Sequence, residues 1–471
     1  MSKVSHYAGM DTRLNRAIAY IQRWTEFQTR LRRQPGCAVS VVQGGRVLLE
    51  AAFGVADVAT GESLTPRHRF RVASHSKAFT AAGILLLRER GALRLDDPAG
   101  QFVSNLHSAV ASTTLGQLLA HAAGLPRDGV DGGAAFTDRR PFADAAGLLA
   151  DLALPPPLEA GLRFKYSNHG YGLLGLVIEA ATGEPYTAWI GREVVAAAGL
   201  EETSADISYV PEGVPLARGH SAELPLGRRL VIPGDNPTGA LAPATGFVAT
   251  ASDMARFFGQ LAPGATTSIL SVSSRRELVH RRWRDENASV ERYYGYGVVA
   301  GPPGEWEFFG HPGSFQGSLS RTVVMPEQDL AVSVLTNAVD GFAWLWVDGI
   351  VHILKTLCDG VPGAEAADWS GQWWSLWGAI DLVPAGDARV LMANPAVLTP
   401  FLDASELEVT GPDTARVVRA GGFERYGEAV QRVRAEDGEV CALRIGGTIL
   451  VTEAALAREL IERYAGSSGP T

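Results

Sequence analysis

The sequence predicts an α+β protein with two domains, and three observations carry this prediction. A strand hairpin stands near the N-terminus, helical patterns and long Pro/Gly-rich loops fill the middle, and strands with a closing helix come late. That order favours one antiparallel sheet completed by strands from both ends of the segment. Beyond about residue 360, short alternating strands with glycine turns take over, as in a small antiparallel β-barrel or sandwich. Because 471 residues exceed one ordinary core, we expect domains at 1–360 and 361–471.

The elements of the larger domain follow from hydrophobic periodicity and breaker residues. An arginine-studded amphipathic pattern predicts a surface helix within Met1–Arg33, and residues 43–45 form a hairpin signal. The stretch 74–90 is apolar all round at its centre and stops at a glycine, so it predicts a buried helix. Further helices are expected at 115–120, 170–182, 186–198 and 342–357 and, after an N-cap at Ser252-Asp253, to about 261; strands are expected at 37–42, 46–53, 293–299, 305–309, 318–325 and 330–335.

The smaller domain is expected to follow a linker at 359–365. Its strand signals include 389–392, 407–409, 415–418 and 440–444, and a helix at 453–464 ends the chain. Four tryptophans gather at its start, namely Trp369, Trp373, Trp374 and Trp377. They could roof a peptide substrate, but we expect them to fill the barrel core, since large aromatic side chains dominate core packing.

Composition excludes several functional classes. The net charge of -9 is spread along the chain, which argues against a nucleic-acid surface. No apolar run approaches the roughly 20 residues that span a bilayer, and Met1–Arg33 carries no signal-peptide pattern. Cys37, Cys358 and Cys441 form no disulfide framework and are expected to be small core residues. Because neither a signal-peptide pattern nor a disulfide framework is present, we expect a cytoplasmic protein. The ten histidines show no metal-ligand spacing, and we expect neither a metal nor another cofactor.

The first motif that could carry chemistry is Ser-x-x-Lys, with Ser74 and Lys77 at the start of the predicted helix. The chain has only four lysines, and no other lysine has a serine at that offset. A buried lysine can lose its proton, whereas arginine stays charged. The spacing puts both side chains on one helix face, and a helix start favours a developing oxyanion. The pair indicates a nucleophile with its base; the alternative is a capping serine before an ordinary basic residue.

Two more motifs follow along the chain. Tyr166 and Asn168 lie in a polar turn before an apolar helix. A tyrosine beside an ammonium group is expected to have a lowered pKa and to shuttle protons; alone, Tyr166 would be a core residue and Asn168 a helix cap. His311 and Gly313 lead into a strand, where glycine allows close approach and a backbone N–H could complete an oxyanion hole. Alone, that motif would be a turn with a solvent-facing histidine.

Together the three motifs resemble, in order and rough spacing, those of the superfamily of class C β-lactamases, penicillin-binding proteins and family VIII esterases. The stretches 93–98, 114–125, 246–253 and 335–337 also look like its framework, so the resemblance covers roughly residues 35–358. It implies a β-lactamase-like catalytic domain, with an antiparallel sheet flanked by helices plus a helical subdomain.

The third motif differs from the one that many members of this superfamily have. Many members have Lys-Thr-Gly as the third motif, and the lysine helps to bind the β-lactam carboxylate; here His311 stands in its place. The replacement argues against efficient β-lactamase activity. His-x-Gly is instead similar to D-aminopeptidases and to penicillin-binding-protein-type thioesterases, which are peptide cyclases. Both append a lipocalin-like domain, which fits the C-terminal barrel.

The resemblance implies a role for each residue of the first two motifs. Ser74 would be the acylated nucleophile, and Lys77 would accept its proton. Tyr166 would relay the proton to the leaving group and later activate the attacking nucleophile. Asn168 would hydrogen-bond Lys77 and the substrate amide.

The third motif and the barrel supply the remaining candidates. The backbone N–H groups of Ser74 and Ser314 would form the oxyanion hole, and Gly313 would lie against the substrate. His311 would position substrate or stabilise charge. Arg444 could bind a substrate carboxylate, although a solvated arginine is the plainer expectation.

These residues predict an active-site-serine acyl-transfer enzyme for peptide-derived substrates. The leading expectation is a standalone thioesterase that takes a peptide from a carrier-protein domain and releases it as a macrocycle. A D-stereospecific aminopeptidase or amidase, a family VIII-type carboxylesterase and a catalytically idle binding protein stay open. Water or an amine can attack the same acyl-serine, so the catalytic residues alone do not separate the enzymes. The expected partner is a peptidyl thioester, ester or amide, with no nucleic acid and no membrane.

Overall fold

The structure is a computed structural model that describes residues 12–129, 132–137, 140–224, 226–358, 363–421 and 425–465. The chain divides into two compact units. One unit is Arg33–Val347, and the other joins Met1–Arg32 to Asp348–Thr471. The expected boundary between residues 360 and 361 lies outside the described residues and stays a prediction.

A nine-stranded antiparallel sheet forms the centre of the unit Arg33–Val347, in the order β3-β2-β1-β14-β13-β12-β11-β10-β9. The first and last long strands lie side by side, with Cys37 of β1 opposite Thr336 of β14. A sheet completed from both ends of the segment is therefore confirmed. The strands are β1 (Gly36–Gln43), β2 (Arg46–Asp57), β3 (Glu62–Ser63), β9 (Trp283–Arg284), β10 (Tyr293–Tyr294), β11 (Val299–Ala300), β12 (Phe309–Phe315), β13 (Ser318–Met325) and β14 (Leu330–Thr336).

Local chemistry explains where the sheet keeps to the prediction and where it departs from it. Gly44 and Gly45 turn the β1–β2 hairpin with φ of 54° and 79°, the conformation that a tight hairpin turn requires. The expected strand 293–299 is instead two short strands, because Gly295 donates a backbone hydrogen bond to Val298 and turns the chain. The expected strand 305–309 is wrong: β12 begins only at Phe309, after the Gly-Pro-Pro-Gly run 301–304, where proline lacks the ladder donor.

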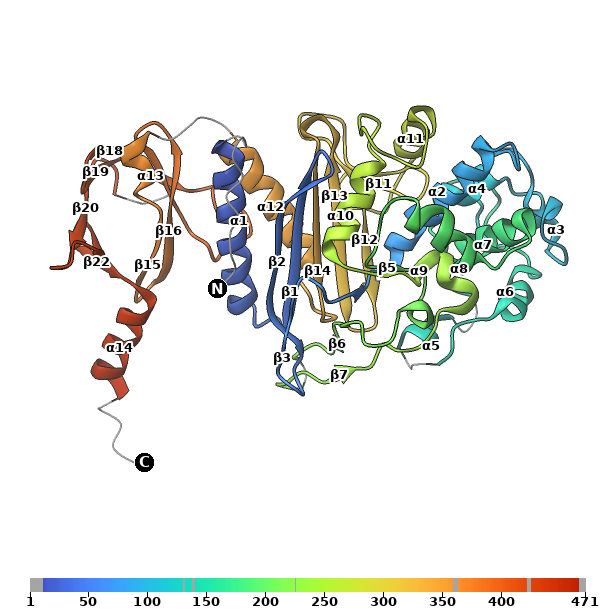
Figure 1. Cartoon of the computed structure of the whole chain (residues 1–471), viewed down its shortest axis with the longest axis horizontal. Coiled ribbons are helices and arrows are strands. Elements are labelled where there is room, and N and C mark those ends of the chain that lie inside the picture. The colour runs from blue at the N-terminus through green and yellow to red at the C-terminus, as the bar shows by residue number, and fades with distance from the viewer. Residues whose placement is uncertain are drawn as a thin grey trace. The chain divides into compact units, whose positions relative to one another are not determined.

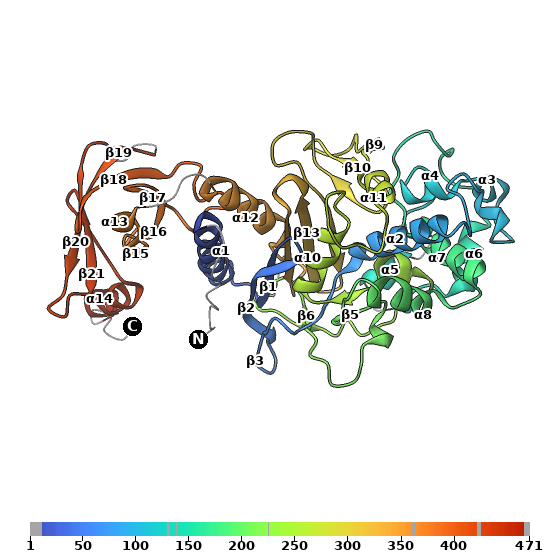
Figure 2. The ribbon, with the colours of Figure 1, turned by 45° about the horizontal axis from the view of Figure 1, so that its top comes forward.

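Helices cover the sheet and build a second layer beside it. Figures 1 and 2 show α10 lying against the sheet, where it packs on β1, β13 and β14. The helix α2 is buried over most of its length and contacts α7 and α9. The helices are α2 (Ser76–Glu89), α3 (Ser108–Ala111), α4 (Leu115–Leu119), α5 (Gly132–Thr137), α6 (Ala145–Leu152), α7 (Asn168–Thr182), α8 (Tyr186–Ile190), α9 (Ala242–Thr245), α10 (Ala251–Gln260), α11 (Val272–Val279) and α12 (Ala343–Leu357), the last running into the second unit.

Two helix ends differ from the prediction. The N-cap of α10 is Thr250, whose hydroxyl accepts from the backbone N–H of Asp253, so the expected cap at Ser252-Asp253 is wrong. Asp253 instead accepts hydrogen bonds from the backbone of Glu202 and the side chain of Thr203. After α8, the helix continues as a π-turn over Gly191–Ala196.

The second unit holds a closed eight-stranded barrel, in the order β15 to β22, which confirms the antiparallel barrel. The helix α1 (Thr12–Leu31) packs in this unit: Tyr20 lies 5.1 Å from Phe401 and Phe27 lies 5.8 Å from Trp374, ring centre to ring centre. The remaining elements are α13 (Ala364–Ala367), β15 (Gly371–Ser375), β16 (Gly378–Gly386), β17 (Arg389–Ala393), β18 (Ser405–Gly411), β19 (Thr414–Arg419), β20 (Ala429–Arg434), β21 (Val440–Ile445), β22 (Thr448–Val451) and α14 (Glu453–Tyr464).

The burial of individual side chains corrects two expectations. Trp369 and Trp373 are buried in the barrel core, but Trp377 is 93% exposed at the turn between β15 and β16, so it is not a core residue. Cys37 is buried, whereas Cys441 is exposed because it lies on an outward position of β21. Among the helices of the described residues, none is long and apolar enough to cross a membrane.

Candidate active site

Ser74 lies in a tight 3-10 turn, Ala73–His75, directly ahead of α2. The residue before it, Ala73, has a φ of 52°, a strained value for a residue with a Cβ. Ser76 stabilises this turn: its hydroxyl donates to the carbonyl of Ala73 (2.6 Å) and accepts from the N–H of Phe247 (3.0 Å). Ser74 therefore lies on a turn that is held by hydrogen bonds, two residues before α2 begins.

His75 ties the same turn to the sheet. Its Nδ1–H donates to the carbonyl of Val72 at 2.9 Å, and its Nε2 accepts from the hydroxyl of Thr322 on β13 at 3.0 Å. Complete burial lowers the pKa of His75 to about 4, outweighing the hydrogen bond to Val72. The ring is therefore neutral at neutral pH, so one ring nitrogen donates and the other accepts.

Lys77 is fully buried beneath Ser74. Its Nζ lies 3.1 Å from Ser74 Oγ, 2.7 Å from Asn168 Oδ1 and 2.8 Å from the carbonyl oxygen of Ala244. Burial lowers the pKa of Lys77 well below its usual range; Asp128 opposes the shift. A neutral amine has two N–H donors and one lone pair, and the two carbonyl oxygens can only accept. The lone pair is therefore left for the hydroxyl proton of Ser74.

Tyr166 also contacts Ser74. Its hydroxyl lies 2.7 Å from Ser74 Oγ, and the Lys77 amine lies 4.7 Å from the centre of its ring. The expectation of a lowered pKa is wrong: burial raises the pKa of Tyr166 and outweighs the hydrogen bond to Ser74, which lowers it. The phenol therefore keeps its proton at neutral pH and donates to Ser74 Oγ.

Asn168 begins α7 and connects Lys77 to an acidic residue. Its Oδ1 accepts from Lys77, and its Nδ2 donates to Asp128. The two contacts together define the orientation of the amide. The helix cap is Ser167, whose hydroxyl accepts from Gly170, so a capping role for Asn168 is excluded. Asp128 also pairs with Arg127, 3.2 Å from carboxylate to guanidinium.

His311 lies on β12 and is 3% exposed, so a solvent-facing histidine is wrong. Its Nδ1–H donates to the carbonyl of Pro312 at 2.6 Å, and its Nε2 accepts from the hydroxyl of Tyr294 at 3.1 Å. Burial, followed by the charge of Lys77, lowers the pKa of His311 well below its usual range. The ring is neutral and contributes hydrogen bonds rather than a positive charge.

Gly313 is required because β12 packs closely against the turn Ala73–His75. A Cβ at this position would lie 2.3 Å from the carbonyl oxygen of Val72 and 2.3 Å from Ser320 Oγ. Only glycine lets β12 pass so near the turn that carries Ser74. Ser314 follows in β12, opposite Leu319 of β13, and lines the same cavity as Ser74.

A single cavity of about 970 Å³ brings the three motifs together. Its lining includes Ser74, Tyr166, Asn168, His311, Gly313 and Ser314. All residues of the lining belong to the unit Arg33–Val347, and Arg444 is not among them. Arg444 is exposed on β21, opposite Gln431 and Ile449.

Sequence reasoning missed two residues of this cavity. Asp128 follows no recognisable motif, and only its contact with Asn168 reveals it. Tyr294 lies in a Tyr-Tyr-Gly-Tyr-Gly run that begins at Tyr293, and this aromatic run ahead of the third motif could have indicated it. Within the described residues, no group of three or more His, Cys, Asp or Glu side chains could hold a metal ion.

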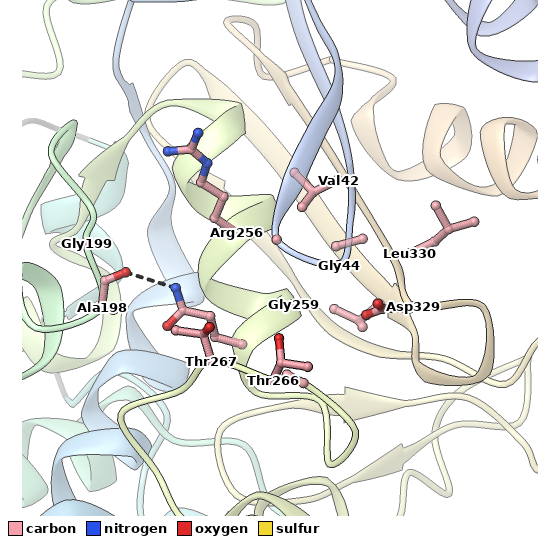
Figure 3. Close-up of a pocket in the computed structure, with 15 residues that line it drawn as sticks. Val42, Gly44, Ala198, Gly199, Arg256, Gly259, Thr266, Thr267, Asp329 and Leu330 are labelled. Atoms are coloured by element: carbon pink, nitrogen blue, oxygen red, sulfur yellow. Dashed lines mark hydrogen bonds between the residues drawn. The ribbon is translucent and has the colours of Figure 1, made fainter. Parts of the chain in front are cut away.

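A second, smaller cavity of about 330 Å³ lies beside the β1–β2 hairpin turn (Figure 3). Arg256 and Asp329 are among the residues that line it (Figure 3), and Gln260 donates to the carbonyl of Ala198 at 2.9 Å. It contains none of the residues that the three motifs predicted. The chemistry of the motifs therefore belongs to the larger cavity.

The family model described as Beta-lactamase matches residues 23–343. This chain belongs to the Beta-lactamase family. Protein flp of Staphylococcus aureus is 32% identical over 161 residues, which cover 33% of this chain and 32% of that protein. Penicillin-binding protein 4* of Bacillus subtilis is 33% identical over 168 residues, covering 35% and 37%. The chain thus spans about a third of the length of these curated relatives.

Solved structures of this β-lactamase-fold group match between 68% and 93% of this chain. The octameric penicillin-binding protein homologue of Pyrococcus abyssi has a TM-score of 0.64 and 21% identity, covering 92% of this chain and 100% of its own. SurE with D-Leu has a TM-score of 0.59 and 23% identity, covering 93% and 99%. A D-stereospecific amidohydrolase from Streptomyces has a TM-score of 0.57 and 25% identity, covering 68% and 94%. The fold is that of β-lactamase-related serine hydrolases.

Proposed function

We propose that this protein forms an acyl-Ser74 intermediate with peptide-derived substrates and passes the acyl group to water or to an amine. The observation that carries the proposal is the contact of Ser74 Oγ with two groups at once, the Tyr166 hydroxyl at 2.7 Å and the Lys77 amine at 3.1 Å. Lys77 can take the proton of Ser74, while Tyr166 still has a proton to give to the leaving group. A weak nucleophile such as serine needs both a base and an acid.

In the acylation step, Ser74 Oγ attacks the substrate carbonyl while its proton moves to the lone pair of Lys77. The ammonium then has three N–H donors for the three oxygen atoms around it, those of Ser74, Asn168 and Ala244. The backbone N–H groups of Ser74 and Ser314 would stabilise the oxyanion. When the carbon–leaving group bond breaks, Tyr166 gives its proton to the leaving group and is reprotonated from Lys77.

In the second step, water or an amine attacks the acyl group and gives a proton to Tyr166. The proton passes on to Lys77 and finally to Ser74 Oγ, which leaves the acyl carbon as a hydroxyl. The finer assignment that we propose is a thioesterase that releases a peptide from a carrier protein, as a macrocycle when the peptide's own amine attacks. The cavity of about 970 Å³ supports a peptidyl rather than a single aminoacyl group, because it stands near the top of the roughly 300–1,000 Å³ range of small-molecule sites.

A D-stereospecific aminopeptidase or amidase is the second candidate. The observation that favours it is the carboxylate of Asp128 on the cavity wall, which could accept a hydrogen bond from a substrate ammonium. The likeness to the Streptomyces D-stereospecific amidohydrolase, at 25% identity, points to the same class.

Intact-protein mass spectrometry of Ser74 adducts tests the proposal. The panel contains a peptidyl thioester with a C-terminal D-residue, its L-epimer, a D-aminoacyl amide and a penicillin. We expect an adduct with the D-configured peptidyl thioester that is absent in Ser74→Ala, and chromatography of the product then separates a cyclic from a linear peptide. Adduct with the aminoacyl amide alone would favour the amidase, and no Ser74-dependent adduct at all would show an idle binding protein.

A further inference from the structure

The active-site cavity carries an excess of positive charge. Its basic lining residues are Arg127, Arg163, Lys165 and Arg292, and its acidic ones are Asp128 and Asp285. The described lining is thus formally positive in a chain whose net charge is -9. Such a local reversal of sign raises the local concentration of anions.

The three arginines are already neutralised by carboxylates. The pairs are Arg127–Asp128 at 3.2 Å, Arg163–Glu286 at 2.9 Å and Arg292–Asp285 at 2.6 Å. Asp128 is further engaged by Asn168, and Asp285 accepts from the backbone of Asn287. Both acidic groups of the lining therefore already accept hydrogen bonds from neighbouring residues.

Lys165 has no such partner. Its side chain is half-buried and lines the cavity. Its ammonium makes no hydrogen bond or ion pair with any residue that the structure describes, while its backbone N–H is held by the carbonyl of His121 at 2.8 Å. An anion that enters the cavity would therefore meet an ammonium that has no described counter-ion.

We propose that Lys165 recognises a carboxylate of the substrate and makes the enzyme selective for anionic over neutral substrates. The inference rests on the proposed acyl transfer at Ser74 and adds the substrate class to it. Lys165 directly precedes Tyr166, whose hydroxyl contacts Ser74 Oγ. Lys165 and Ser74 line the same cavity, so the bound carboxylate would belong to either the acyl part or the leaving part of the substrate.

Matched thioester pairs test the proposal and distinguish the two positions. In the first pair, the acyl part is N-succinyl-D-phenylalanine or its neutral succinamoyl analogue, on one neutral thiol. In the second pair, one neutral acyl group leaves from 3-mercaptopropionate or from 3-mercaptopropionamide. The measured quantity is the ratio of kcat/KM for the anionic to the neutral member, in the wild type, Lys165→Met and Lys165→Arg, with Lys355→Met on α12 as the control.

We expect the wild type to prefer the anionic member of one pair by about tenfold, as one charge-assisted hydrogen bond allows. Lys165→Met should abolish the preference, mainly through KM, and Lys165→Arg should restore most of it. The preference should shrink in high salt, because the cavity is open to solvent. Lys355→Met should keep the wild-type ratio.

Three results would overturn the proposal. One is a ratio near unity for both pairs in a wild type that still acylates Ser74. Another is an equal loss for both members of a pair in Lys165→Met, which would indicate a structural role. The third is a ratio that Lys165→Met leaves intact. If no thioester forms a Ser74 adduct in the wild type, the proposed function itself fails, and intact-mass measurement identifies that case separately.

Discussion

Lys77 Nζ lies 3.1 Å from Ser74 Oγ, and its two other contacts are oxygen atoms that can only accept hydrogen bonds. In the neutral amine, the lone pair faces the serine; in the ammonium, three donors meet three acceptors. The same contacts thus satisfy both protonation states. This explains why a lysine stands at this position in a chain that has only four lysines.

Lys77→Arg should abolish acylation even though it conserves the charge. A guanidinium stays protonated in proteins and cannot take the proton of Ser74. We expect the burst with a nitrophenyl ester to fall by at least about 10³-fold, within the range for loss of a general base. Stopped-flow absorbance measures it, with Lys355→Arg as the control. A burst of wild-type size in Lys77→Arg would contradict the role of Lys77 as the base.

The sequence predicted the spacing of this pair but not the environment that makes it reactive. Ser-x-x-Lys predicts a shared helix face, whereas the lowered pKa of Lys77 depends mainly on complete burial, which no local pattern shows. The predicted direction of the Tyr166 pKa was wrong for the same reason. The motifs indicate that an amine lies nearby, but they do not show the burial that raises this pKa. Asp128 was missed because no local pattern marks a residue defined by one long-range contact.

Tyr166→Phe should slow amides far more than thioesters of the same acyl group. The phenol is protonated at neutral pH and contacts Ser74 Oγ at 2.7 Å. An amine must be protonated as it leaves, whereas a thiol with a pKa near 8.5 can leave as a thiolate. We expect kcat/KM to fall about 100-fold more for the amide. Equal losses for the two substrates would show that Tyr166 does not protonate the leaving group.

Gly313→Ala should displace β12 from the turn Ala73–His75. The new Cβ would meet the carbonyl of Val72 and the hydroxyl of Ser320, each at 2.3 Å. We expect a lower Tm and a loss of acylation of about 100-fold, since a small displacement of the oxyanion donors is costly. Gly191→Ala is the matched control, because a Cβ there has no neighbour within 4 Å. Wild-type acylation by Gly313→Ala would refute the packing argument.

His75 should make the protein less stable as the medium becomes acidic. Its pKa is about 4 in the folded protein, against about 6.5 in the unfolded chain. In that window the unfolded state binds more protons, so stability is complete above about pH 6.5 and is lost as the pH falls towards 4. His75 alone then accounts for about 2 kcal/mol between pH 7.5 and 5.

Urea unfolding at the two pH values measures this contribution. His75→Asn keeps a side-chain donor for Val72 but has no titrating group, so its difference in unfolding free energy should be smaller than that of the wild type. His280, which is exposed on the surface, provides the control His280→Asn. An unchanged pH dependence in His75→Asn would mean that the ring is not held neutral in the folded state.

Asp128 and Arg127 should shift the acid limb of the pH–rate profile in opposite directions. Activity requires neutral Lys77, so kcat/KM falls as the pH drops through the pKa of this amine. Asp128 raises that pKa and Arg127 lowers it. Asp128→Asn should therefore move the acid limb to lower pH, and Arg127→Gln should move it to higher pH.

The two shifts should also differ in size. The side chain of Arg127 is 69% exposed, against 18% for that of Asp128, so solvent and salt screen the arginine more strongly. We expect the shift of Arg127→Gln to be smaller and to disappear in high salt, while that of Asp128→Asn persists. Profiles of kcat/KM for one ester, at low and high salt, measure both. Shifts of the same sign would show that the acid limb does not report Lys77.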